Sequence, residues 1–130
     1  MKNIRYIILT FLSLVCMAQE KEPKQFAIYQ ILIEPQEEQK LAAWQVELNY
    51  SNLEIVGIAG GDEPFEKPSD YDSRGLSGGR IILATFSLAK NLRVGRQVVA
   101  RVHVLEQAGA MRKSKFKIIA VANEKGERIE

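Results

Sequence analysis

The sequence predicts an all-β protein with a single β-sandwich or barrel. Several runs of seven to ten residues alternate apolar and polar side chains, as half-buried strands do. Clusters of Gly, Pro, Asn and Asp separate these runs and mark turns. After the first 18 residues no segment has sustained helical periodicity, and the roughly 112 residues that follow suffice for one core.

The N-terminus has the pattern of an export signal. Residues 1–18, MKNIRYIILTFLSLVCMA, start with two basic residues, continue with a short apolar run and end with small residues at the spacing that signal peptidases recognise. The pattern predicts a cleaved signal peptide, with cleavage between Ala18 and Gln19. The apolar run is shorter than the about 20 residues of a membrane-spanning helix. We therefore expect export to the periplasm or the cell exterior, without membrane insertion after cleavage.

Cys16 is the only cysteine and leaves an alternative open, a lipoprotein modified at that residue. The residues before it lack the usual pattern of a lipoprotein signal. With cleavage after Ala18 the mature domain contains no cysteine, so it must fold without a disulfide.

The mature chain is electrically balanced. Without Lys2 and Arg5 it has 16 basic and 16 acidic residues. This balance gives no support to a nucleic-acid partner. Residues 19–24 are polar, contain Pro23 and are expected to form a flexible lead-in.

The first half of the domain contains three expected strands. The segment from Gln25 to Ile33 is rich in β-branched and aromatic residues and ends at Glu34 and Pro35. Alternation in AAWQVELNY, residues 42–50, predicts a buried face, and Leu53 to Ala59 continues as a strand. The predicted core residues of the second strand are Trp44, Val46, Leu48 and Tyr50.

The second half contains three more expected strands. In the expected strand of residues 80–88, RIILATFSL, the predicted core face consists of Ile82, Ala84, Phe86 and Leu88. In the expected strand of residues 96–107, the predicted core face consists of Val98, Ala100, Val102 and Val104. The last strand runs from Lys115 to Ala122, where alternating lysines at 113, 115 and 117 indicate an edge protected against aggregation.

A long loop, residues 62–79, is the first place to look for a ligand, because long loops in small domains are often functional. Phe65 and Tyr71 lie in it as candidate contacts for a sugar or another ligand. Its acids suggest a calcium site, but only their proximity in the sequence supports one, and a solvated loop is the favoured alternative. The candidate calcium ligands are Asp62, Glu63, Asp70 and Asp72.

Apolar residues also occur on the parity opposite to the predicted core. They are Ile81, Leu83, Val99, Leu105, Ile119 and Val121, of which the first four are the candidates for a partner-binding patch. The alternative is that neighbouring strands, loops or a second copy cover them, because parity alone does not say which sheet each strand joins.

The order of these segments resembles the cohesin-like β-sandwich family, which is grouped with several carbohydrate-binding modules. The resemblance rests on AAWQVELNYSN, LEIVGIAGG, GGRIILATFS, GRQVVARVHV and the closing ANEKGERI, and covers residues 25–129. It implies a single jelly-roll sandwich over residues 25–130, with nine strands in typical members. Cohesins hold dockerin modules on one sheet face, which implies a protein partner.

No arrangement of residues suggests catalysis. His103 is the sole histidine, and no serine has a nucleophile-elbow context. The sequence therefore predicts an exported, non-catalytic recognition module that binds a protein partner through a sheet face, with no cofactor other than the calcium just considered. Two alternatives remain: a carbohydrate-binding module that uses the 62–79 loop, and a structural β-sandwich of the cell envelope.

Overall fold

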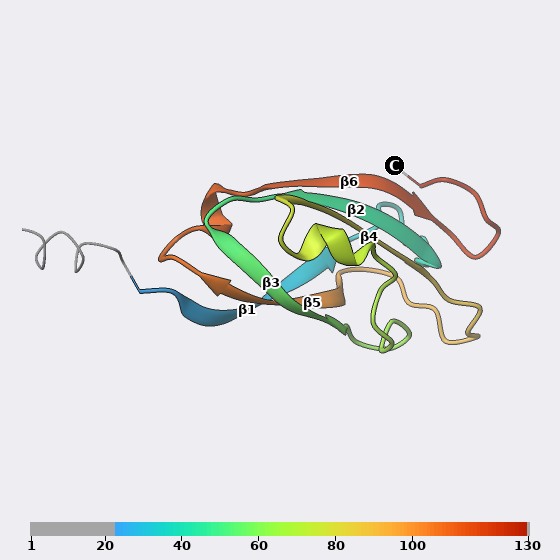
Figure 1. Cartoon of the computed structure of the whole chain (residues 1–130). Coiled ribbons are helices and arrows are strands. Elements are labelled where there is room, and N and C mark those ends of the chain that lie inside the picture. Colours follow the sequence, from blue (N-terminus) through green and yellow to red (C-terminus); the bar gives the residue numbers. More distant parts are fainter. Residues whose placement is uncertain (1–22, 130) are drawn as a thin grey trace, which may run out of the picture.

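Two three-stranded antiparallel sheets pack face to face in the computed structural model, which describes residues 23–129 (Figure 1). Sheet A has the order β1-β5-β3, with β1 Gln25–Ile33, β5 Gln97–Glu106 and β3 Leu53–Gly60. Sheet B has the order β4-β2-β6, with β4 Arg80–Phe86, β2 Ala43–Asn49 and β6 Lys115–Ala122. The predicted all-β sandwich is confirmed. The described part has six strands, fewer than the nine typical of the family that the sequence resembles.

The predicted signal peptide and residues 19–22 of the lead-in lie outside the described residues. Within residues 23–129 the helical segments are two short 3₁₀ helices, η1 Ser73–Leu76 and η2 Met111–Lys113. None of this described helical structure has the length and apolar character needed to cross a bilayer.

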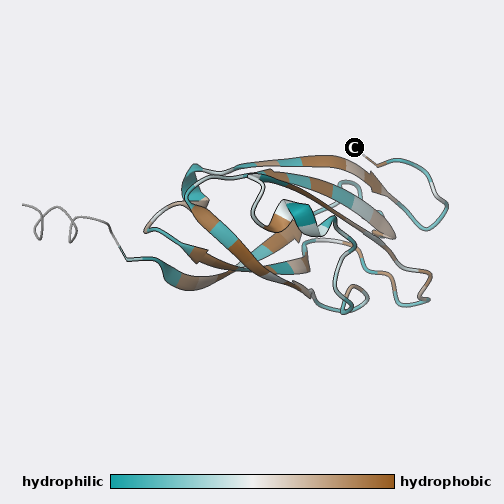
Figure 2. Cartoon of the chain, viewed as in Figure 1, coloured by the Kyte–Doolittle hydropathy of each residue, from teal (hydrophilic) through white to brown (hydrophobic). Residues whose placement is uncertain are grey.

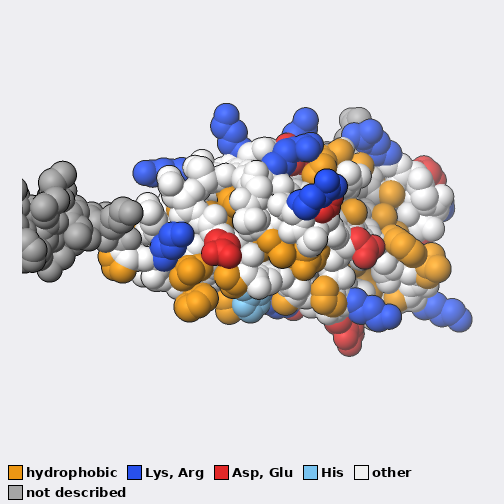
Figure 3. Space-filling model, viewed as in Figure 1, with side chains coloured by type: hydrophobic (Ala, Val, Ile, Leu, Met, Phe, Trp, Pro, Cys, Tyr) orange, Lys and Arg blue, Asp and Glu red, His pale blue; other side chains and the backbone are white. Residues whose placement is uncertain are grey.

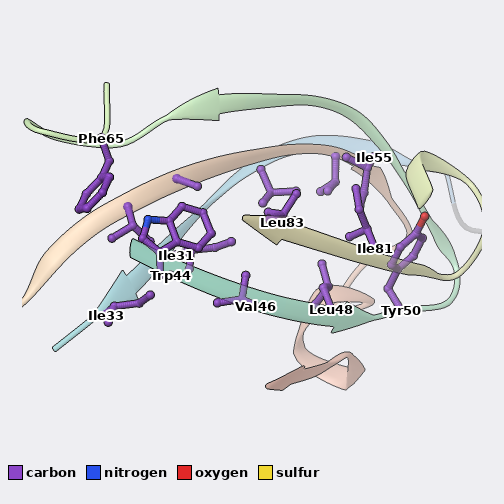
Figure 4. Packing of buried hydrophobic residues seen from close by; sticks show 14 of the residues in the cluster. Ile31, Ile33, Trp44, Val46, Leu48, Tyr50, Ile55, Phe65, Ile81 and Leu83 are labelled. Carbon is purple, nitrogen blue, oxygen red and sulfur yellow. The ribbon is translucent and has the colours of Figure 1, made fainter. Parts of the chain in front are cut away.

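Strand β2 lies at the centre of sheet B, and its predicted faces are confirmed. Figure 2 shows hydrophobic and hydrophilic residues alternating along it. The four predicted core side chains are 0–8 % exposed: Trp44, Val46, Leu48 and Tyr50. They point toward sheet A together with residues of the other strands (Figure 4).

The predicted faces of β4 are wrong by one residue. Directly paired residues of an antiparallel sheet point to the same side, and β2 pairs its core residues Leu48 and Val46 with Ile81 and Leu83. These two partners are 2 % and 0 % exposed, so they belong to the core and not to a partner-binding patch. Phe86, which was assigned to the core, is 68 % exposed.

The prediction for β5 fails at a β-bulge. Ala100 pairs with Ile31 and Val98 pairs with Leu32, which leaves Val99 as an extra residue. A bulge turns two successive side chains toward the same face. Val99 and Ala100 are therefore both fully buried, and the prediction that Val99 faces outward is wrong.

One lateral side of the sandwich, between β3 and β4, is closed by the segment 61–79. Phe65 of this segment is 2 % exposed and meets the Trp44 ring edge to face, with 6.4 Å between ring centroids (Figure 4). The Tyr50 hydroxyl donates to the carbonyl of Gly75 in η1. We call this side, with residues 61–79 packed between β3 and β4, the closed side.

The opposite lateral side lies between the edge strands β1 and β6, and we call it the open side. Phe116 and Ile118 of β6 pair with the core residues Leu48 and Val46, so they share the inward face. Both are nevertheless 46 % exposed. The sandwich is therefore filled on one side and only partly covered on the other.

Candidate functional site

Small side chains from all three strands of sheet B form a shallow depression on its outer face. The pairing places Ala43 between Phe86 and Ala122, and Gln45 between Ala84 and Ala120. A cavity of about 390 Å³ lies over these residues. We call it the alanine trough, and it comprises Ala43, Gln45, Ala84, Phe86, Ala120 and Ala122. Because four of the six side chains are methyl groups, a ligand can approach close to the sheet.

Polar groups bound the trough at two ends. Asp70 lies at the β4 end, where its backbone N–H donates to the carbonyl of Ala84 at 2.9 Å and its carbonyl accepts from the N–H of Ala84 at 3.1 Å. Arg128 lies at the β6 end and donates from Nη2 to the carbonyl of Ile119 at 2.9 Å. The trough is thus an apolar floor between a carboxylate and a guanidinium.

The local sequence after β6 explains how Arg128 reaches the trough. The Asn123 side-chain oxygen accepts from the backbone N–H groups of Lys125 and Glu127, both at 3.0 Å. Gly126 has a φ of 77°, a conformation that glycine adopts at little cost. The chain therefore turns back, and Arg128 bridges to Ala122 of β6.

The other half of the same sheet face is charged. Glu47 accepts from Nη2 of Arg80 at 2.9 Å and from Nδ2 of Asn49 at 2.7 Å. These hydrogen bonds, led by the one from Arg80, hold the pKa of Glu47 below its usual value, so this carboxylate remains ionised at neutral pH. Lys117 and Lys115 are the β6 partners of Glu47 and Asn49. An apolar region beside a charged border has the composition of a protein-binding surface.

Four of the six residues predicted to contact a ligand or partner are buried: Phe65, Ile81, Leu83 and Val99. Phe65 was placed in an exposed loop, but the loop folds inward and its ring packs on Trp44. Leu105 is partly exposed on the outer face of sheet A, where it pairs with Phe26. Tyr71 is 37 % exposed in the 61–79 segment. The structure does not bring the six residues together at one surface.

Two of the candidate calcium ligands form ion pairs with arginines. Asp62 forms an ion pair with Arg101 at 2.9 Å, and Glu63 forms one with Arg93 at 3.7 Å. Within residues 23–129 no group of three or more His, Cys, Asp or Glu side chains is arranged to hold a metal ion. The predicted site is therefore not assembled in this structure.

Asp72, the fourth candidate, has a structural role instead. Its Oδ1 accepts from the backbone N–H of Arg74 at 3.0 Å and caps η1. The Arg74 side chain also donates hydrogen bonds to the Asp72 carboxylate. These contacts lower the pKa of Asp72 to about 2.

The alanine trough was not predicted because sequence reasoning assigned Ala84 and Phe86 to the core. The outward parity of Ala43 and Gln45 in β2 was the available signal. Only the register between strands shows which residues of β4 and β6 lie beside them.

Comparison with solved structures identifies the fold. The chain aligns with a crystal structure of a CaDoc0917–CaCohA2 complex at 11 % identity, with 85 % of each chain covered and a TM-score of 0.63. A type I cohesin–dockerin complex from Clostridium thermocellum, Coh-OlpA-Doc918, matches at 10 % identity, 85 % and 84 % coverage and a TM-score of 0.63. A non-cellulosomal cohesin from Archaeoglobus fulgidus matches at 14 % identity, 84 % and 75 % coverage and a TM-score of 0.60.

No protein-family model matches the sequence, and no curated protein matches it. At 10–14 % identity the solved structures establish the fold and not a shared function. The chain therefore has a cohesin-like β-sandwich fold, and the resemblance inferred from its sequence is confirmed at that level.

Proposed function

We propose that this protein is an exported, non-catalytic recognition module that binds a protein partner through the alanine trough of sheet B. The observation that carries the proposal is the division of one sheet face into an apolar depression and a charged border. The cohesin-like fold supports it, because the matched cohesin from Clostridium thermocellum is described in a complex with a dockerin.

The dimensions and chemistry of the trough suit a polypeptide. Its floor of alanine methyl groups admits the side chains of a helix or loop, and Phe86 offers an exposed aromatic ring beside it. Aromatic residues, Phe among them, are enriched at the cores of protein interfaces. The ion-paired Glu47 and Arg80 and the two lysines of β6 can orient the partner.

Export rests on the pattern in residues 1–18, with a periplasmic or extracellular destination. Expression of the full chain in a bacterial host with an intact secretion pathway should give a mature form that begins at Gln19. N-terminal sequencing of the soluble product tests this cleavage site. An intact N-terminus, or a lipid attached to Cys16, would contradict the proposed processing.

An arginine placed in the floor of the trough tests the binding surface. Ala84→Arg fills the depression with a large charged side chain, so it should weaken partner binding at least about tenfold. Ala108→Arg is the matched control, because Ala108 is exposed in the turn between β5 and η2 and does not line the trough. Both variants should keep the wild-type circular-dichroism spectrum.

The partner can be found by photo-crosslinking. A benzophenone side chain at position 84 should crosslink a specific protein from the native culture fluid or envelope, and the same group at position 108 should not. Purification of that protein then allows its affinity for both arginine variants to be measured. Equal binding by Ala84→Arg and Ala108→Arg would remove the trough from the proposed interface.

A further inference from the structure

Two cavities follow one another along the open side, between β1 and β6. The first has about 320 Å³ and is lined by Tyr29, Leu32 and Phe116 among others. The second has about 340 Å³ and lies between the end of β1, from Ile33 onward, and the β6 residues from Ile118 to Val121. Together they form an elongated cleft with a largely apolar lining, which we call the edge cleft.

Strand β1 borders the edge cleft with a free edge. Within residues 23–129 it pairs with β5 alone, so the backbone N–H and C=O groups on its other edge have no strand partner. Its nine residues, QFAIYQILI, include no charged residue and no proline. Phe26, Ile28 and Leu32 are 77 %, 60 % and 46 % exposed. A long apolar edge of this kind is prone to pair with another strand.

The other three edges of the sandwich are protected. Strand β3 has Glu54 and a bulge at Val56. The outer edge of β4 pairs with Asp70. Strand β6 has lysines at 115 and 117, and the tail bridges it at Ala122. Charges, bulges and covering segments are common protections against strand pairing. Among the described strands, β1 is therefore the edge that lacks such protection.

We propose that an extended segment of a partner protein adds to β1 as a fourth strand of sheet A. Its inward side chains would fill the edge cleft and cover the exposed parts of Phe116 and Ile118. Backbone hydrogen bonds to β1 would supply much of the affinity, and pockets for alternate side chains would supply the specificity. This surface adjoins the alanine trough along β6, where Ala120 and Arg128 line both, but it lies at the β1 edge and goes beyond the proposed function.

Charge indicates the chemistry of the segment. Four basic residues lie on the two elements that border the edge cleft: Arg112 and Lys113 in η2 follow Met111, which lines the first cavity, and Lys115 and Lys117 lie on the outer face of β6. None of them forms an ion pair with another described residue. Figure 3 shows Lys and Arg side chains along the upper edge of the molecule, above β6. An acidic segment complements this border, whereas a second copy of the chain paired through β1 would add more positive charge to it.

The partner segment should therefore alternate large apolar residues with acidic ones. A nine-residue peptide that alternates Ile and Glu is a suitable probe. The expected result is saturable binding to the mature chain. NMR should then show slower hydrogen exchange of the β1 amides and chemical-shift changes at Phe116 and Ile118. A peptide that alternates Ile and Lys should bind at least about tenfold more weakly because of the basic border.

Methylation of every second backbone nitrogen of the Ile and Glu peptide tests the strand geometry. One of the two possible methylation patterns should abolish binding, because it removes the N–H groups that donate to β1, while the side chains stay the same. Binding that survives both patterns would show that no strand is added, and would overturn the proposal.

A pair of variants locates the bound strand. Ile118→Lys places a charge in the edge cleft and should lower the affinity for the peptide that alternates Ile and Glu at least about tenfold. Ala84→Arg, in the alanine trough, should leave peptide binding unchanged, so a failure of one surface is distinguishable from a failure of the other. Absence of binding at millimolar peptide, or a dimer of the chain paired through β1 in sedimentation and exchange experiments, would overturn the proposal.

Discussion

The two lateral sides of this sandwich differ in how their core residues are covered. On the closed side, residues 61–79 pack across the space between β3 and β4, and Phe65 becomes part of the core. On the open side, β1 and β6 leave an apolar cleft, and Phe116 and Ile118 stay half exposed. The exposed apolar residues Phe116 and Ile118 of β6 are therefore inward-facing residues without a cover, and not outward-facing residues in excess.

The closed side depends on close backbone contacts as well as on Phe65. A Cβ atom added to Gly60 would overlap the backbone of Glu66, and one added to Gly61 would overlap the backbone of Val98. Two glycines at the end of β3 thus let the chain turn tightly into the covering segment. The open side has no comparable segment among the described residues, which makes it available to a ligand.

The largest expected effect distinguishes the two sides directly. Phe65→Ala should lower the free energy of unfolding by about 3–5 kcal/mol, because it removes a buried ring and leaves a cavity beside Trp44. Phe116→Ala on the open side should lower it by only about 1 kcal/mol, because half of that ring is already exposed to water. Urea denaturation followed by far-ultraviolet circular dichroism measures both. Equal losses would mean that the two sides do not differ in packing.

A smaller loss of stability is expected when a methyl group is added to a glycine on the closed side. Gly61→Ala forces the new Cβ against the carbonyl of Val98, so the covering segment must move, at a cost of about 1–3 kcal/mol. Gly57→Ala in the same strand is the control, since its nearest neighbour would be Cβ of His103 at 3.9 Å. The control should change stability by less than about 0.5 kcal/mol. The same urea titration compares the two alanines, and similar losses would argue against tight packing at Gly61.

The smallest expected effect concerns the charge of Asp72 at the start of η1 on the closed side. Its pKa is lowered from 3.8 to about 2, chiefly by the hydrogen bond from Arg74. A lowered folded-state pKa contributes stability above the unfolded value near pH 4, and that contribution is lost as the pH falls toward 2. Asp72→Asn keeps a capping side chain but not the charge.

The difference in urea midpoint between wild type and Asp72→Asn should therefore be constant above about pH 5 and shrink between about pH 4 and pH 2. NMR titration of the Asp72 carboxyl carbon provides an independent check. A titration midpoint near the ordinary value of 3.8 would contradict the contact with Arg74.

Strand positions could be predicted from the sequence, and so could the buried residues Ala100, Val102 and Val104 of β5, but the faces of β4 and the bulge at the start of β5 could not. In β2, polar Gln45 and Glu47 identify the outer face, so Trp44 and Val46 were correctly assigned to the core. In β4 both parities are apolar at the start of the strand, so only pairing with β2 decides between them. The bulge at Val99 depends on the ladder with β1, which no local pattern reports.

The alanine trough was beyond sequence reasoning for a related reason. It forms from alanines of three strands that are distant in the chain, Ala43, Ala84 and Ala120. Alanine is among the residue types most often buried, so each alanine alone gives no sign of an exposed binding surface. The burial of Phe65 likewise depends on the tertiary path of the 61–79 segment, whereas its sequence has only the polar composition of a loop.

The contact between Trp44 and Phe65 gives the molecule an optical reporter. Trp44 is the only tryptophan, it is 2 % exposed, and its immediate aromatic neighbour belongs to the covering segment. Its fluorescence should be emitted at short wavelength while the segment is in place and should shift to the red when water reaches the indole. A single unmodified chain can therefore report detachment of residues 61–79 separately from loss of the strands, without any added dye.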